Sequence, residues 1–290
     1  MPTLKSTLSA AHVGVFFVHG LYGHPDEYRE VRETLTSLGF KTAAPSLMAH
    51  GDRRDVRLKD MVVEEVLEVL REDFKAFSLH CEHVILVGHS LGGLLSAMLA
   101  AEKESSHGVP NLKGLVLISA PYHRGYWINA FWDLLRMDVS AFFPGLQYVP
   151  EAKTGLPRPQ FKPWWRGRLK EEAEALFALA ELRLPDISMP TWLMHSPYDL
   201  VVPYGDMMRL ANAIDKPDLV TMLPLDGCGH QVFPTSRAQV QALNVILKAI
   251  QSVTGCPMPL ETQSFDSVGA DALSVIAASH RKVTVPSSFE

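Results

Sequence analysis

The sequence predicts an α/β fold: a doubly wound, mostly parallel sheet that carries an inserted cap. Short apolar runs rich in β-branched and aromatic residues alternate with amphipathic stretches of helical length, which is typical of parallel strands joined by right-handed crossovers. This alternation stops after Pro121, which indicates an insertion. The predicted strands are residues 13–18, 84–87, 115–118, 191–194 and 219–223.

Four amphipathic stretches are predicted helices: residues 26–38, 58–77, 91–102 and 238–253. The first closes at Gly39, and glycine commonly ends helices because it accepts a left-handed backbone. The second places Val62, Val66 and Leu70 near one stripe with acidic residues largely opposite, as in a helix that buries one face.

The same pattern divides the chain into three parts. Residues 1–121 and 185–255 are the predicted core, and residues 122–184 are a cap or lid with no strand–helix rhythm. The cap holds Trp127, Trp132 and two further tryptophans, and exposing so many aromatic rings to water is unfavourable, so we expect it to fold over something apolar. Residues 256–290 are rich in serine and predict a mobile or loosely docked tail.

Composition excludes several classes of function. The 290 residues carry a net charge of −5. This charge balance does not favour nucleic acid as a partner, because proteins that bind nucleic acid typically have an excess of basic residues. No apolar run approaches the ~18 residues that span a bilayer. Three cysteines without a C-x-x-C pair favour reduced thiols and a cytoplasmic location. We expect neither a metal nor a nucleotide cofactor, because no metal motif or phosphate-binding glycine loop is present, and we interpret the histidines of residues 80–83 as a solvated loop.

A candidate nucleophile follows the strand at residues 84–87. The pattern G-x-S-x-G spans residues 88–92 between that strand and a predicted helix, which is the context of a nucleophile elbow. Such a turn strains its central residue by about 1–3 kcal/mol and needs small neighbours, which Gly88 and Gly92 provide. We therefore expect Ser90 to be the nucleophile; the alternative is a glycine-rich turn with an incidental serine.

A serine hydroxyl is a weak nucleophile and needs a base, which an acid in turn orients. Behind a G-x-S-x-G elbow the acid and then the base follow along the chain. His230 lies in a glycine-rich loop after a late strand, whereas His280 lies in the predicted tail. Asp199 follows the strand at residues 191–194 and is favoured as the acid over Asp206 and Asp226.

The oxyanion of such a reaction needs preorganised donors, each worth about 10²–10³ in rate. We expect one donor to be the backbone N–H of Leu91, directly after the candidate nucleophile. The other is the N–H of Leu21, in the loop after the first strand, where Gly20 lets the backbone turn.

Together these segments resemble the α/β-hydrolase superfamily, and within it the carboxylesterase and monoacylglycerol-lipase-like serine hydrolases. The resemblance covers about residues 10–253 and is carried by H-G-L-Y-G at 19–23, G-H-S-L-G-G at 88–93, Asp199 before Val202 and Pro203, and Gly229 with His230. It implies Ser90 as nucleophile, His230 as base, Asp199 as its orienting acid, and the amides of Leu21 and Leu91 as the oxyanion hole. One departure is His195, where relatives often carry glycine.

The expected function is cleavage of small-molecule carboxylic esters with small to medium apolar acyl groups, through an acyl-enzyme and without a cofactor. We expect Tyr22, His89, Trp127 and Trp132 to contact the substrate. Two alternatives stay open: a monoacylglycerol lipase or thioesterase for longer acyl chains, and a receptor that keeps the fold without catalysis. The sequence does not indicate an oligomeric state.

Overall fold

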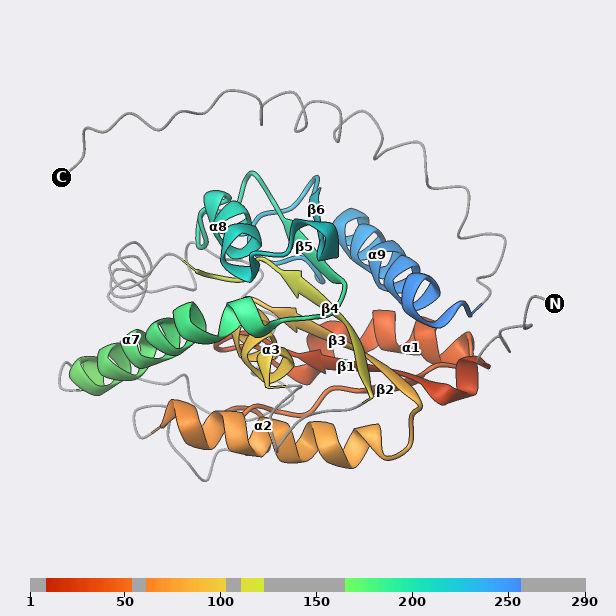
Figure 1. The fold of residues 1–290 in the computed structure, drawn as a ribbon, viewed down its shortest axis with the longest axis horizontal. Helices are drawn as coiled ribbons and strands as arrows, with labels where there is room; N and C mark the ends of the chain where they lie inside the picture. The colour runs from red at the N-terminus through yellow and green to blue at the C-terminus, as the bar shows by residue number, and fades with distance from the viewer. Residues whose placement is uncertain (1–8, 54–60, 103–110, 123–164, 257–290) are drawn as a thin grey trace. The chain divides into compact units, whose positions relative to one another are not determined.

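The computed structural model describes residues 9–53, 61–102, 111–122 and 165–256. In this part of the chain six strands form one sheet in the order β2-β1-β3-β4-β5-β6, and every neighbouring pair is parallel (Figure 1). The strands are β1 (Val13–Val18), β2 (Lys41–Ala43), β3 (His83–His89), β4 (Leu112–Ile118), β5 (Thr191–His195) and β6 (Val220–Pro224). The predicted parallel α/β sheet is therefore confirmed.

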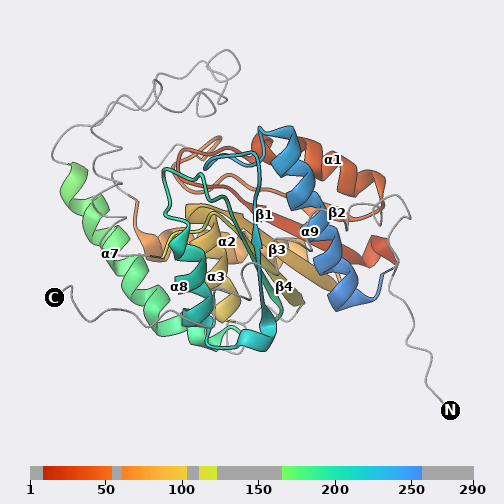
Figure 2. The same cartoon turned by 90° about the horizontal axis from the view of Figure 1, so that it is seen from above.

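Helices cover both faces of this sheet. Figures 1 and 2 show α1 and α9 on one face, with α2, α3, α7 and α8 on the other. Their bounds are α1 (Arg29–Ser37), α2 (Val63–Ser78), α3 (Leu91–Ala101), α7 (Trp165–Arg183), α8 (Gly205–Ile214) and α9 (Ser236–Thr254). Short 3-10 turns are η1 (Ala10–His12), η2 (Pro25–Tyr28), η5 (Leu184–Asp186) and η6 (Pro217–Leu219). Helices on both sides make the sheet doubly wound, as predicted.

Neighbouring residues of the central strands pack into the core on opposite faces of the sheet. In β1, the ring of Phe16 packs edge-on against Phe74 of α2, at 5.4 Å between ring centroids. The next residue, Phe17, packs against Tyr28 on the other face, at 4.8 Å. Since side chains alternate along a strand, a strand buried on both faces must be apolar at every position, which is why β1 was visible in the sequence as a continuous apolar run.

The predicted elements differ from the observed ones mainly at their ends. β3 and β4 each extend beyond the predicted apolar run, and the predicted helix at 26–38 is divided into η2 and α1. Pro25 opens η2, while Tyr28 has backbone angles of φ −94° and ψ 2°, which are not α-helical. The edge strand β2 has only three residues and no buried position, so no apolar run predicts it.

The part of the predicted insertion that the structure describes contains a helix that the sequence analysis did not predict. This helix, α7, has 19 residues. Its residues Leu176, Phe177 and Ala180 are buried in the core that α3 also helps to form. Glu172 accepts a hydrogen bond from the backbone N–H of Val63 at 2.9 Å, so α7 also caps the first turn of α2. The first half of α7 is charged and its apolar residues do not gather in one stripe, so helical periodicity does not reveal this helix.

Other predictions for the chain fall outside the described residues. These are the cap over 123–164, with Trp127 and Trp132, and the tail from 257 onward. Within the described ranges, none of the helices combines the length and hydropathy needed to cross a membrane. All three cysteines lie in the described ranges, where each is buried and none forms a disulfide.

Candidate active site

Ser90 occupies a strained turn between β3 and α3. Its backbone angles are φ 54° and ψ −126°, a conformation that costs a non-glycine residue about 1–3 kcal/mol. The turn is closely packed, because a Cβ atom on Gly92 would lie 2.3 Å from the carbonyl oxygens of both Val18 and His19. A Cβ atom on Gly88 would lie 2.4 Å from the carbonyl oxygen of Gly92. The two glycines of the motif are therefore a steric requirement of the turn.

The structure brings Ser90 together with the two residues predicted to be its partners. The distance from Ser90 Oγ to His230 Nε2 is 2.9 Å, and that from His230 Nδ1 to Asp199 Oδ2 is 2.8 Å. A carboxylate only accepts hydrogen bonds, so Nδ1 carries the proton and Nε2 is left to accept the hydroxyl proton of Ser90. The three residues follow the carboxyl ends of β3, β5 and β6, which parallel pairing places at one edge of the sheet.

Burial and charge set the protonation states of this triad. Burial lowers the pKa of His230, and the nearby Asp199 carboxylate only partly offsets that effect, so the pKa stays below the ordinary value. Burial alone would raise the pKa of Asp199, but the charge on His230 and hydrogen bonds from His195, His230 and the Val202 amide outweigh it and hold the pKa well below its usual range. Near neutral pH the arrangement is a neutral imidazole beside an ionised carboxylate, which is the form a general base requires.

The two other candidates for the acid, Asp206 and Asp226, make different contacts. Asp206 accepts the backbone N–H of Tyr122 and a guanidinium N–H of Arg209, each at 2.8 Å. Asp226 pairs with Arg237 at 2.8 Å on the exposed surface. Neither contacts His230 through these groups, whereas Asp199 does, so the position of the acid agrees with the sequence-based choice.

The loop after β1 passes directly beside the candidate nucleophile. A Cβ atom on Gly20 would lie 2.9 Å from Cβ of Ser90, so only glycine allows this close approach. The backbone N–H of Gly23 donates to the carbonyl of Gly20 at 2.9 Å, and Tyr22 has a positive φ of 60°. Leu21 lies within this tight turn and Leu91 begins α3 directly after Ser90, which are the positions expected for the two donors.

Two histidines not predicted for this role hold that loop in place. His19 donates from Nδ1 to the carbonyl of Gly20 at 2.9 Å, and its Nε2 accepts the backbone N–H of Leu47 at 3.0 Å. His50 Nε2 accepts the backbone N–H of Tyr22 at 3.0 Å. Both histidines therefore connect the loop after β1 to the loop after β2. Burial lowers the pKa of His19, which keeps Nε2 free of a proton and able to accept.

His89 does not lie where a substrate contact was expected. Its side chain is 2% exposed, and Nε2 donates to the backbone carbonyl of His230 at 2.9 Å. On the other side of the ring, Nδ1 lies 3.6 Å from Oε1 of Glu27. Burial alone would lower the pKa of His89, but the Glu27 carboxylate outweighs it and raises the pKa. This position corrects the expected substrate contact to a contact with the loop that carries His230, and Glu27 had no signal in the sequence.

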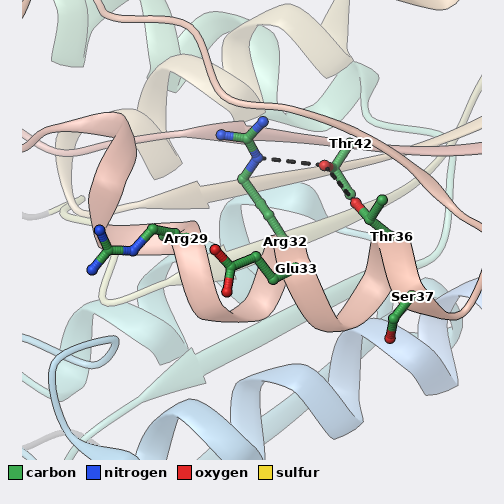
Figure 3. A pocket seen from close by; sticks show the side chains of 6 residues that line it. All are labelled: Arg29, Arg32, Glu33, Thr36, Ser37 and Thr42. Atoms are coloured by element: carbon green, nitrogen blue, oxygen red, sulfur yellow. Dashed lines mark hydrogen bonds between the residues drawn. The ribbon is translucent and has the colours of Figure 1, made fainter.

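A separate hollow lies between α1 and the edge strand β2. It has a volume of about 510 Å³ and is lined by Arg29, Arg32, Glu33, Thr36, Ser37 and Thr42. Figure 3 shows these side chains on α1 and β2, where Arg32 Nε donates to Thr42 Oγ1 at 3.4 Å. The hollow shares no residue with the triad.

Known proteins resemble this chain in fold. A family model described as the alpha/beta hydrolase family matches residues 15–242. A search of curated proteins gives no match.

Among solved structures, one from the study of LipS and LipT, two metagenome-derived lipolytic enzymes, is 18% identical with a TM-score of 0.63. The match covers 83% of this chain and 94% of that one. The Paleococcus ferrophilus monoacylglycerol lipase is 20% identical with a TM-score of 0.61, covering 82% and 94%. A thioesterase domain from the curacin biosynthetic pathway is 18% identical with a TM-score of 0.60, covering 82% and 92%. At such identities the structures show a shared fold, and the family model matches more than half of the sequence. The chain therefore belongs to the alpha/beta hydrolase family.

Proposed function

We propose that this protein is a serine hydrolase that cleaves carboxylic esters with small to medium apolar acyl groups. The observation that carries the proposal is the continuous relay from Ser90 Oγ through His230 to Asp199, with distances of 2.9 and 2.8 Å. A lone serine or histidine would be unremarkable, but this order of hydroxyl, imidazole and carboxylate is what activates a serine for acyl transfer.

In the first half of the proposed reaction, Ser90 Oγ attacks the carbonyl carbon of the ester while His230 Nε2 takes the hydroxyl proton. The carbonyl oxygen becomes an oxyanion, which the backbone amides of Leu21 and Leu91 stabilise. As the tetrahedral intermediate collapses, its bond to the alcohol oxygen breaks and His230 returns the proton to that oxygen. The alcohol leaves, and the acyl group stays on Ser90.

In the second half, water attacks the acyl carbon and His230 Nε2 takes a proton from it. The bond to Ser90 Oγ then breaks, His230 returns the proton to Ser90, and the carboxylic acid leaves. Asp199 stays ionised throughout and stabilises the imidazolium of His230 in both halves. The pKa of Asp199, held well below its usual range, supports this role.

The proposed substrate class rests on aromatic residues. Tyr22 lies on the loop beside Ser90, and we propose that it contacts the substrate together with Trp127 and Trp132 of the cap. Aromatic rings suit uncharged, partly apolar acyl groups. The fold is shared with lipolytic enzymes, a monoacylglycerol lipase and a thioesterase domain, so longer acyl chains and thioesters are the second candidate class.

The first experiment asks whether Ser90 is activated. The experiment compares the full chain, its Ser90→Ala variant and a Ser37→Ala control at an exposed position of α1. Each is treated with a fluorophosphonate probe and assayed on p-nitrophenyl esters. We expect labelling and turnover in the wild type and control, and neither in Ser90→Ala, because only an activated hydroxyl reacts with the probe. A wild-type chain without labelling would favour the receptor alternative, and turnover retained in Ser90→Ala would refute this mechanism.

The second experiment compares acyl chain lengths. We expect kcat/KM to peak for p-nitrophenyl esters of short to medium acyl chains. A maximum on long-chain esters, monoacylglycerols or acyl thioesters would replace the proposed substrate class with the second one.

A further inference from the structure

A second imidazole contacts the candidate catalytic acid. His195 is the last residue of β5, and its side chain is 1% exposed. Its Nε2 lies 3.0 Å from the carbonyl oxygen of Val202 and 3.3 Å from Oδ2 of Asp199. Both oxygens only accept hydrogen bonds, so Nε2 carries a proton and shares it between them. The ring packs edge-on against Tyr204, with 5.8 Å between centroids, which fixes its orientation.

This contact completes the set of donors around the Asp199 carboxylate. Oδ1 accepts the backbone N–H groups of Val201 and Val202, each at 2.8 Å. Oδ2 faces the Nδ1–H of His230 at 2.8 Å and the Nε2–H of His195 at 3.3 Å. Each carboxylate oxygen offers about two lone pairs, so these four donors occupy the whole acceptor capacity of the group. Without the imidazole of His195, Oδ2 would be left with His230 as its one donor of these two.

We propose that His195 is a positioning residue of the triad, whose N–H fixes the Asp199 carboxylate and weakens its pull on the His230 proton. This inference rests on the proposed function. A carboxylate that shares Oδ2 between two donors is a weaker acceptor for each of them than one that serves His230 alone. His195 therefore keeps His230 unprotonated, and ready to act as a base, at a lower pH than Asp199 alone would allow.

The other ionisable groups around His230 are held by separate contacts. His89 lies behind it with ring centroids 5.1 Å apart, and Glu27 lies beyond His89. Cys228, two residues before His230, is buried, with its pKa raised by burial. Tyr204 contacts the ring of His195 and not that of His230. None of these contacts involves Nε2 of His195, so replacing that side chain leaves them in place. It alters His230 through Asp199 and through the direct electrostatic interaction of His195 with His230.

The test compares three variants of the full chain. His195→Phe keeps an aromatic ring against Tyr204 but has no donor, and His195→Met is a second donor-free variant with a flexible side chain that fills the space differently. His195→Gln restores an N–H near the position of the imidazole Nε2. The control is His80→Gln, which changes an exposed histidine far from the triad.

Two measurements are made on each variant: the pH profile of kcat/KM with a p-nitrophenyl ester, and the NMR titration of the His230 ring. We expect the donor-free variants to move the acid limb and the His230 titration upward by about half a unit to one unit. We also expect kcat to fall about tenfold with little change in KM. His195→Gln and the control should stay close to the wild type in both measurements.

A His230 titration that is unchanged in the donor-free variants would overturn the proposal, as would an equal shift in His195→Gln, which would mean that shape rather than the N–H matters. Circular dichroism identifies any variant that fails to fold, and the remaining donor-free variant then decides. The NMR titration reads the Asp199–His230 pair whether or not an ester is turned over. Loss of the proposed function would therefore appear as missing wild-type turnover, independently of this result.

Discussion

The close packing around Gly92 leads to a prediction that rests on steric repulsion alone. Gly92 is the second residue of α3, and an alanine Cβ there would lie 2.3 Å from two backbone carbonyl oxygens of the β1 end, those of Val18 and His19. A close carbon-to-oxygen contact in proteins is about 3.3 Å, so the overlap is about 1 Å. Backbone oxygens cannot rotate away as a side chain can. Gly92→Ala therefore forces α3 to withdraw from the sheet.

The free-energy cost of Gly92→Ala follows from the burial of α3. Every residue from Gly92 to Ala101 is buried, so a withdrawal of about 1 Å loosens packing along the whole helix. Overpacking a core typically costs about 1–3 kcal/mol, and we expect the upper end or beyond, about 3–5 kcal/mol, because the obstacle is backbone. For a domain of this size that lowers Tm by about 6–20 °C. The shift also displaces Ser90 and the Leu91 amide, so hydrolytic activity should fall with stability.

Gly205→Ala is the matched control. Gly205 is the first residue of α8, and a Cβ atom there would meet only the flexible end of Arg209, at 3.3 Å. Alanine is favoured over glycine in helices by up to about 1 kcal/mol, so Tm should hold or rise slightly. Both variants are compared with the wild type by calorimetry and by guanidinium unfolding followed by circular dichroism. A Gly92→Ala protein that melts within 2 °C of the wild type (about 1 kcal/mol or less) would refute the steric reasoning.

Three further predictions concern the site. Asp199→Asn should lower kcat by about 10³–10⁴, because an amide no longer fixes the tautomer of His230, whereas Asp226→Asn on the exposed surface should leave kcat unchanged; equal kcat in both variants would contradict the choice of acid. Ser90→Gly and Ser90→Ala should both be inactive, but the glycine variant should be about 1–2 kcal/mol more stable in guanidinium, since glycine accepts the positive φ of 54° without strain. Equal stability would show that the turn is unstrained. His19 has a pKa lowered by burial from its ordinary value of 6.5, so its neutral form is favoured in the folded state; its contribution to stability is full above pH 6.5 and is lost as pH falls below that value. Unfolding free energies at pH 7 and pH 5 should therefore differ less in His19→Gln than in the wild type or in the His80→Gln control, and an unchanged difference would argue against the buried neutral ring.

The sheet was predictable because most of its strands are buried on both faces. A strand such as β1 must be apolar at every position because all of its side chains are buried. The result is a continuous apolar run in the sequence, which segments on the surface do not have. β2 lies at the edge with three partly exposed residues, and α7 has a charged first half and no single apolar stripe. In both, contacts with the rest of the fold stabilise the element more than its own pattern does.

The geometry of the candidate triad was predictable for a different reason. The turn at Ser90 requires glycines at fixed spacing, and the order of elements along the chain then limits where an acid and a base can arise. The supporting contacts leave no such local pattern. His19 and His50 each bond a backbone group 28 residues away, and Glu27 lies in a short turn whose acidic residues look like an exposed helix start. His195 stood out in the sequence only as a departure from glycine, and its bond to Asp199 needed the folded structure.

The order in which the chain is synthesised has a consequence for when activity can begin. Ser90 lies between β3 and α3, but His230 is 140 residues further along and follows β6, whose neighbour in the described sheet is β5. A ribosome adding about 5–20 residues per second needs about 7–28 s to cover that distance. During this interval Ser90 has been synthesised but its base, His230, has not. Emergence of hydrolytic activity during translation would thus report closure of the last strand pair, and a chain truncated before it would be inert.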